Sequence, residues 1–251
     1  LLDMEHIWDF ANTVDVEDVR SILEPQIRCN MAIAEEGLRG NYGANIGSVL
    51  LDMEGNDVRV RAKAYAAAGS DARMNGCEQP VVINSGSGNQ GMTVSMPVIE
   101  FAKELNVGAE KLYRALIISN LISIHQKRYI GSLSAFCGAV TAAAGAGAAI
   151  TYLHGGDYNA IGLTIVNTLA NVGGIVCDGA KPSCAAKIAS SVDAAILAHY
   201  LSSKNCTFQD GEGFVQGDVE ATIRSMGYIG RVGMKATDTE ILNIMIDNTT
   251  V

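Results

Sequence analysis

The chain of 251 residues has little charge and few aromatic side chains: 18% of its residues are Asp, Glu, Lys or Arg, and 6% are Phe, Trp or Tyr. Disordered chains are rich in charge and poor in apolar residues, whereas 48% of this chain is hydrophobic, so disorder is excluded. Basic residues are in the minority, because 18 Lys and Arg face 27 Asp and Glu. The net charge of −9 argues against sequence-independent nucleic-acid binding, which needs a basic surface. With 27 glycines and few aromatics, the core must consist of small aliphatic residues that let backbones approach closely.

Signals for export or membrane insertion are also missing. Asp3 and Glu5 leave no room for a secretory signal at the start, and residues 249–251 carry no anchor or retention signal. Residues 129–156 lack Asp, Glu, Lys and Arg and exceed the roughly 20 residues of a membrane span. They are mostly Ala and Gly, however, without aromatic belts at both ends. We therefore expect buried helices of a cytoplasmic protein without a membrane partner. Because the chain opens on Leu1 and not Met, we expect it to be a fragment or a processed product.

The spacing of apolar residues predicts helices along most of the chain, as in Ile27, Met31, Ala34 and Leu38. There is no internal repeat, no low-complexity linker and no charge run, and only residues 81–83 resemble a strand. The predicted fold class is mainly α: a single compact domain of packed apolar helices with a Gly-rich loop and little or no strand. Helices are expected over 5–24 with a break near 13–15, and over 25–39, 58–68, 92–105 and 109–125, followed by long apolar helices within 132–203 and two short ones within 218–247.

The Gly-rich loop is the segment SGSGNQG at 85–91. Residues 86–91 match the dinucleotide-binding pattern G-x-G-x-x-G, but no alternating βαβ pattern surrounds them, so the match is weak. Glycines free the backbone, and the N–H groups at a helix start attract anions. We therefore predict an anion-binding loop that opens the helix over 92–105; a tight turn between two core elements is the alternative. The candidate substrate-binding residues are Ser85, Gly86, Ser87, Gly88, Asn89 and Gln90.

The six cysteines are Cys29, Cys77, Cys137, Cys177, Cys184 and Cys206. Disulfides are not expected in a chain with a full apolar core and no secretory signal. We predict that the first two and the last are buried small side chains. The other three differ, because Cys137 has small neighbours and Cys177 and Cys184 flank a turn. Thiolates suit iron–sulfur clusters or zinc, yet spacing alone leaves metal ligands and buried thiols both open.

Three long segments carry a resemblance to a known family: 85–91, SLSAFCGAVTAAAGAGAA at 132–149 and NVGGIVCDGAKPSCAAKIASSVDAA at 171–195. They resemble the L-cysteine desulfidase family, also described as serine dehydratase α-chain-like, and more weakly the iron–sulfur L-serine dehydratases. Segments 32–47 and 218–242 fit as well, so the resemblance covers essentially the whole chain. It implies a lyase that performs β-elimination on a small amino acid. The expected reaction is L-cysteine to pyruvate, ammonia and sulfide, with L-serine to pyruvate and ammonia as the alternative.

The resemblance further implies a [4Fe-4S] cluster held by Cys137, Cys177 and Cys184, with one iron open to substrate and no pyridoxal phosphate. Under this hypothesis Lys181 tunes the charge of the cluster or orders the turn. Two alternatives remain. One is a structural zinc on the three cysteines plus His154, and the other is a non-catalytic helical fragment without its cluster.

Full-length members of this family are longer, so residues 1–251 are interpreted as their cluster-binding domain without the N-terminal portion. The proposed base of the family is a cysteine near the N-terminus of the full protein, which has no counterpart here. The catalytic residues are therefore unknown, and neither Cys29 nor Cys77 takes that role. We expect the chain alone to be inactive or nearly so. The resemblance implies a small amino acid as substrate, and close-packing helices are compatible with a homodimer.

Overall fold

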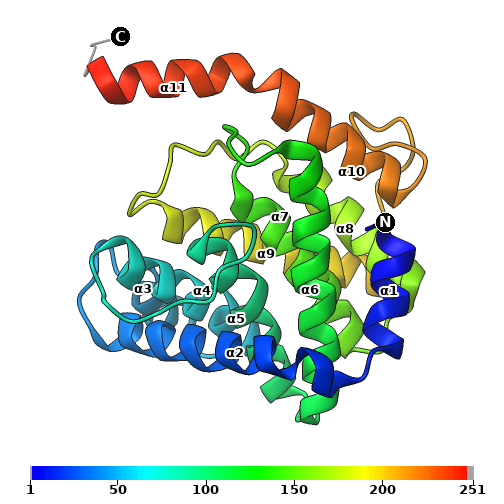
Figure 1. Cartoon of the computed structure of the whole chain (residues 1–251), viewed down its shortest axis with the longest axis horizontal. Coiled ribbons are helices and arrows are strands. Elements are labelled where there is room, and N and C mark those ends of the chain that lie inside the picture. Colours follow the sequence, from blue (N-terminus) through cyan, green and yellow to red (C-terminus); the bar gives the residue numbers. More distant parts are fainter. Residues whose placement is uncertain (1, 248–251) are drawn as a thin grey trace.

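Eleven α-helices account for most of residues 2–247, the part of the chain that the computed structural model describes (Figure 1). Those residues contain no strand, and only the isolated bridges Asn84–Ser87 and Phe136–Val176 pair as in a β-sheet. The prediction of a mainly α, single compact domain is confirmed. The helices are α1 (Met4–Thr13), α2 (Val16–Arg39), α3 (Ile46–Glu54), α4 (Val58–Met74), α5 (Gly88–Glu104), α6 (Ala109–Ile130), α7 (Gly138–Leu153), α8 (Tyr158–Val172), α9 (Cys184–Ser203), α10 (Val219–Tyr228) and α11 (Lys235–Asp247), with a π-helical turn, η1 (Ile229–Gly233), before α11.

Helix α7 lies at the centre and packs against α5, α6, α8 and α9. All of its residues except Gly138 and Tyr152 are buried. A Cβ atom at Gly145 would lie 2.4 Å from the backbone oxygen of Ser119 in α6, so only glycine permits this approach. The expected close packing of small residues is therefore present. No helix within residues 2–247 has both the length and the hydropathy needed to cross a bilayer.

Several helix boundaries differ from those predicted. Helix α2 is one continuous helix that contains Pro25, not two helices with this proline at a start. Helix α4 continues to Met74 instead of stopping near residue 68, and α3 was not predicted at all. Helix α5 begins at Gly88 and runs through Pro97, and its residues 88–102 are buried on every side rather than on one amphipathic face. Tertiary burial thus outweighs the local cost of a proline inside a helix.

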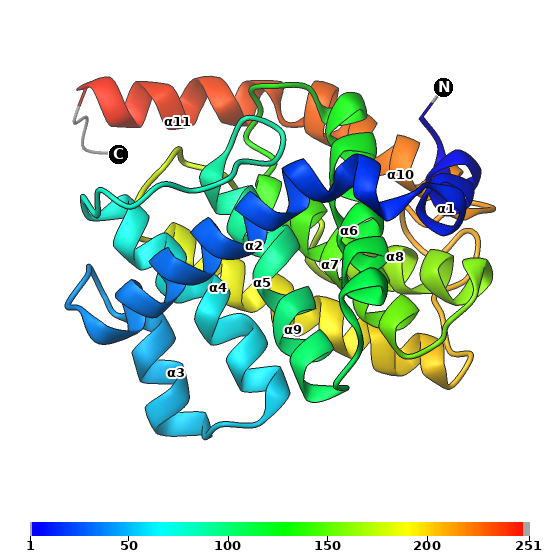
Figure 2. The same cartoon turned by 60° about the horizontal axis from the view of Figure 1, so that its bottom comes forward.

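Two further helices frame the molecule. Helix α2 lies across α4 and α5, as Figure 2 shows. Helix α11 runs along the opposite edge and packs mainly on η1. Together with the loop after Ile130, the first turns of α11 therefore border the region where α5, α7 and α9 begin.

Candidate active site

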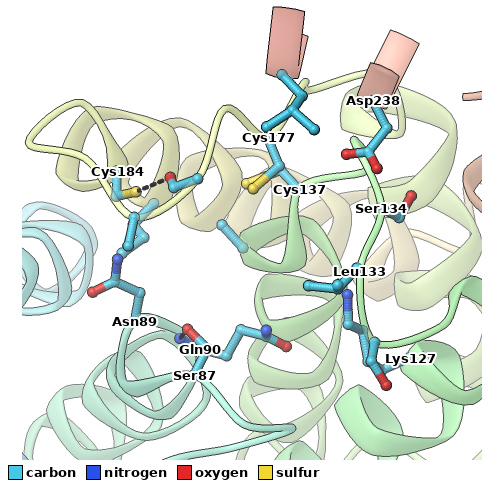
Figure 3. Close-up of a pocket in the computed structure, with 16 residues that line it drawn as sticks. Ser87, Asn89, Gln90, Lys127, Leu133, Ser134, Cys137, Cys177, Cys184 and Asp238 are labelled. Carbon is cyan, nitrogen blue, oxygen red and sulfur yellow. Dashed lines mark hydrogen bonds between the residues drawn. The ribbon is translucent and has the colours of Figure 1, made fainter. Parts of the chain in front are cut away.

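A pocket of about 400 Å³ lies where helices α5, α7 and α9 begin (Figure 3). Cys137, Cys177 and Cys184 all belong to its wall, although 40 and 7 positions separate them in the sequence. Two more helices contribute polar groups, because Lys127 comes from the last turn of α6 and Asp238 from the first turn of α11.

A short antiparallel backbone contact brings the segment of Cys137 next to the segment of Cys177. Phe136 pairs with Val176, and the flanking cysteines extend this pairing. The N–H of Cys137 donates to the oxygen of Ile175 (3.1 Å), and the N–H of Cys177 donates to the oxygen of Ala135 (2.6 Å). Cys137 is also the N-cap residue of α7, and Cys184 is the first residue of α9. Two of the thiols therefore lie at helix N-termini.

The side chains of Cys137 and Cys177 perturb each other's pKa. The neighbouring Cys177 thiol and burial raise the pKa of Cys137, and the neighbouring Cys137 thiol lowers the pKa of Cys177 to about 6. The backbone N–H groups of Ala139 and Gly179 each lower the pKa of the sulfur next to them, Cys137 and Cys177 respectively.

In the turn between Cys177 and Cys184, Lys181 takes the second of its two expected roles, which is to order the turn. Its backbone N–H donates to the sulfur of Cys184 (3.4 Å), so this residue orders the turn through its main chain. The cation that lowers the pKa of Cys177 is instead Lys187, which forms an ion pair with Asp178.

The Gly-rich loop reaches the pocket with only part of its length. Asn84 and Ser87 close a tight turn by two backbone hydrogen bonds (3.1 and 3.0 Å), with Gly86 at φ +81°. Ser87 then caps α5 by accepting from the N–H of Gln90 (3.4 Å). Because the helix begins at Gly88, Asn89 and Gln90 stand in its first turn. The pocket wall contains Ser87, Asn89 and Gln90, and does not contain Ser85, Gly86 or Gly88.

The amides of Asn89 and Gln90 are held in place by their surroundings. Arg73 donates to the side-chain oxygen of Asn89 (3.3 Å). The side-chain oxygen of Gln90 is buried and has no partner among the described residues. Its amide lies against Gly138, where a Cβ atom would approach Nε2 to 2.5 Å. A buried acceptor without a partner is unfavourable by about 1–3 kcal/mol, so Gln90 fits a site that receives a donor from outside the chain.

Sequence reasoning missed Lys127 and Asp238. Within residues 2–247, Lys127 is the one basic and Asp238 the one acidic side chain of the pocket wall. Burial lowers the pKa of Lys127, while the nearby sulfurs of Cys177 and Cys137 oppose this shift. The available signal was that no acidic residue stands three or four positions from Lys127, so α6 offers it no ion-pair partner.

Among residues 2–247, no three His, Cys, Asp or Glu side chains, the three cysteines included, are arranged to hold one metal ion. The zinc alternative also requires His154, which lies elsewhere in the fold. His154 follows the far end of the 16-residue α7, about 26 Å from Cys137 at 1.5 Å per residue. It bonds to the oxygen of Ile150 (2.9 Å) and stacks with His199. Three thiols on one pocket wall are the ligands that an iron–sulfur cluster uses, with one thiolate per iron.

The remaining cysteines lie away from the pocket, and all six are free. The prediction that all three remaining ones are buried is wrong. Cys29 and Cys77 are half-buried, and Cys206 is exposed in the segment after α9.

The fold and the pocket define an all-helical domain whose helix N-termini surround a thiol-lined cavity. The model of the family described as serine dehydratase alpha chain matches residues 2–243, and the chain belongs to this family. UPF0597 proteins of Lachnoclostridium phytofermentans, Desulfitobacterium hafniense and Bacteroides thetaiotaomicron are 63%, 60% and 40% identical over 247, 247 and 249 residues, which is 97–98% of this chain. The chain spans 57–59% of the length of these relatives.

Proposed function

We propose that the chain is the cluster-binding part of a lyase that converts L-cysteine to pyruvate, ammonia and sulfide. The main support is the shared pocket: Cys137, Cys177 and Cys184 line it together with the polar start of α5. Membership of the serine dehydratase alpha chain family supports the reaction class. The printed name of that family favours L-serine as the second candidate substrate, which would give pyruvate and ammonia.

Under this proposal the three cysteines hold a [4Fe-4S] cluster with one open iron. When bound, the cluster supplies a Lewis acid that withdraws charge from the leaving thiolate or hydroxyl. The chain contributes the environment of the thiolates: the backbone N–H groups of Ala139 and Gly179 lower the pKa of two of the sulfurs, and the N-termini of α7 and α9 offset negative charge. The proposed chemistry uses no pyridoxal phosphate.

The start of α5 is proposed to bind the substrate carboxylate. Ser87, Asn89 and Gln90 present neutral polar groups on the same wall as the thiols. Elimination breaks the Cα–H bond and the bond from Cβ to sulfur or oxygen. A base takes the proton from Cα, and the electron pair of the Cα–H bond forms the C=C bond. The leaving group departs with the electron pair of its bond to Cβ. Water then converts the enamine to pyruvate and ammonia. Under this proposal the base belongs to the N-terminal portion of longer members.

The test is anaerobic reconstitution with iron and sulfide, followed by analysis of both elements per chain. Cys137→Ser, Cys177→Ser and Cys184→Ser should each lower the iron content strongly. The matched control is Cys206→Ser, an exposed cysteine away from the pocket, which should load iron like the parent chain. Equal iron in all four variants would contradict the ligand assignment.

Activity is measured as pyruvate and sulfide formed from L-cysteine, and as pyruvate formed from L-serine. Because the chain spans 57% of the Desulfitobacterium relative, that longer protein is assayed beside it. Pyruvate from either protein supports the lyase proposal, and the ratio of the two substrates identifies the preferred one. Full iron loading without turnover in both proteins would favour the non-catalytic alternative.

A further inference from the structure

We propose that Lys127 and Asp238 recognise the two charges of a zwitterionic α-amino acid, Lys127 its carboxylate and Asp238 its α-ammonium group. This inference rests on the proposed function and extends it, because it assigns recognition of the substrate backbone to two residues outside the Gly-rich loop.

Lys127 supplies a cationic group without a carboxylate partner among the described residues, beside the sulfurs of Cys137 and Cys177. Its ammonium group forms no ion pair or side-chain hydrogen bond within residues 2–247, although it is half-buried in the pocket wall. The neutral polar groups of the wall, such as the Ser87 hydroxyl, give no countercharge to a carboxylate. An unpaired ammonium group beside these polar groups therefore matches the carboxylate of a substrate.

Asp238 supplies the opposite charge from a different element. It belongs to the first turn of α11, is solvent-exposed, and its carboxylate has no ion pair or hydrogen bond within the described residues. Figure 3 shows its carboxylate and the nitrogen of Lys127 entering the same pocket from different helices. No ion pair within 4.0 Å joins the two residues, so both charges stay available to a ligand that fits between them.

The thiol cluster provides a third fixed point. Cys137, Cys177 and Cys184 lie on the same wall as Lys127 and Asp238. A ligand whose carboxylate, ammonium group and side-chain heteroatom each meet a separate partner is held at three points. Three such contacts distinguish L from D forms, whereas two do not. The arrangement therefore predicts discrimination between the two enantiomers of an amino acid with a heteroatom on Cβ, and the proposed substrate makes L-cysteine the expected one.

The test compares four thiols that differ in the charges they carry: L-cysteine, D-cysteine, 3-mercaptopropionate without the ammonium group, and cysteamine without the carboxylate. Dissociation constants are measured by calorimetry under anaerobic conditions, for the metal-free and the reconstituted chain. The variants are Lys127→Gln and Asp238→Asn. Their matched controls are Lys111→Gln on α6 and Glu240→Gln on α11, both exposed and both outside the pocket wall.

Each variant should lose affinity only for ligands that carry the charge it recognises. Lys127→Gln should weaken L-cysteine and 3-mercaptopropionate about tenfold and leave cysteamine unchanged. Asp238→Asn should weaken L-cysteine and cysteamine about fivefold, because the carboxylate is exposed, and should leave 3-mercaptopropionate unchanged. The preference for L-cysteine over D-cysteine should fall in both variants, and the two controls should bind like the parent chain.

The outcomes of this test distinguish the inference from the proposed function. The inference is overturned if a variant loses affinity equally for all ligands or for none of them, or if the parent chain does not bind L-cysteine. Pyruvate formation with unchanged ligand selectivity in the variants would overturn it while the lyase proposal stands. The expected selectivity without pyruvate from the chain or its longer relative would support an amino-acid site and count against the lyase.

Discussion

Replacing Gly91 by alanine should destabilise the folded chain, because at this glycine α5 packs directly against the backbone of Val82 and Ile83. A Cβ atom at Gly91 would lie 2.0 Å from the backbone oxygen of Val82 and 3.2 Å from Cα of Ile83. The nearest atom is main chain, so no side-chain rotation relieves the contact. Val82 is itself fixed by buried Asn30, which accepts from its N–H (2.8 Å) and donates to its oxygen (3.3 Å).

The magnitude follows from these contacts. Real Cβ atoms stay at least 3.0 Å from other heavy atoms, so the segment must move by about 1 Å. Such overpacking costs about 1–3 kcal/mol. Loss of the two bonds to Asn30 adds about 0.5–1.5 kcal/mol each. The better helix propensity of alanine offsets about 1 kcal/mol of this destabilisation. The free energy of unfolding of Gly91→Ala should therefore fall by about 1–5 kcal/mol.

Urea denaturation of the purified chain measures this change. The matched control is Gly174→Ala, because a Cβ there meets nothing within 4 Å and the backbone has no positive φ. The control should stay within about 0.5 kcal/mol of the parent. A free energy of unfolding for Gly91→Ala within that same margin would refute the argument that α5 is seated by backbone contact.

Three further outcomes test other parts of the structure. Gly138→Ala brings a Cβ to 2.5 Å from the flexible end of Gln90, so we expect less than about 1 kcal/mol of destabilisation. Calorimetry should show weaker binding of L-cysteine, and unchanged affinity would contradict the role of Gln90. Reconstitution should raise the melting temperature, because a group that binds only the folded chain stabilises it, and Cys184→Ser should abolish the rise. Burial raises the pKa of Asp71 from 3.8 to about 6, so the folded state binds its proton more tightly. This contribution to stability is complete below pH 4 and is lost as pH rises through 6. Urea titrations should show a loss of up to about 3 kcal/mol across that window, and Asp71→Asn should flatten it.

The sequence contained more about the start of α5 than its apolar spacing indicates. Ser87 and Gln90 stand in the S-x-x-Q relation of a capping box, and the structure has the first half of that motif, with the N–H of Gln90 bonded to the hydroxyl of Ser87. This signal places the helix start at Gly88, four residues before the apolar pattern becomes regular. The continuation through Pro97 was not predictable locally, because it depends on burial supplied by neighbouring helices.

The candidate site was predictable only for the residues that belong to the long segments carrying the family resemblance. The family resemblance named Cys137, Cys177 and Cys184, and the structure places all three on one pocket wall. Lys127 and Asp238 are 111 positions apart in the sequence and belong to different helices. In its own helix each resembles an ordinary surface charge. Their shared position depends on how α6 and α11 pack around η1, which no local pattern encodes.

The charge of the whole chain and the electrostatics of the pocket have opposite signs. A net charge of −9 indicates a protein that repels anions at long range. At the pocket, however, the N-termini of α5, α7 and α9 meet, and each carries roughly half a positive charge from its unpaired N–H groups. Lys127 adds a full charge that no described residue pairs. Backbone direction therefore makes this pocket attractive to thiolates and carboxylates. Counting side-chain charges along the sequence cannot detect such a site, because most of its positive potential belongs to the main chain.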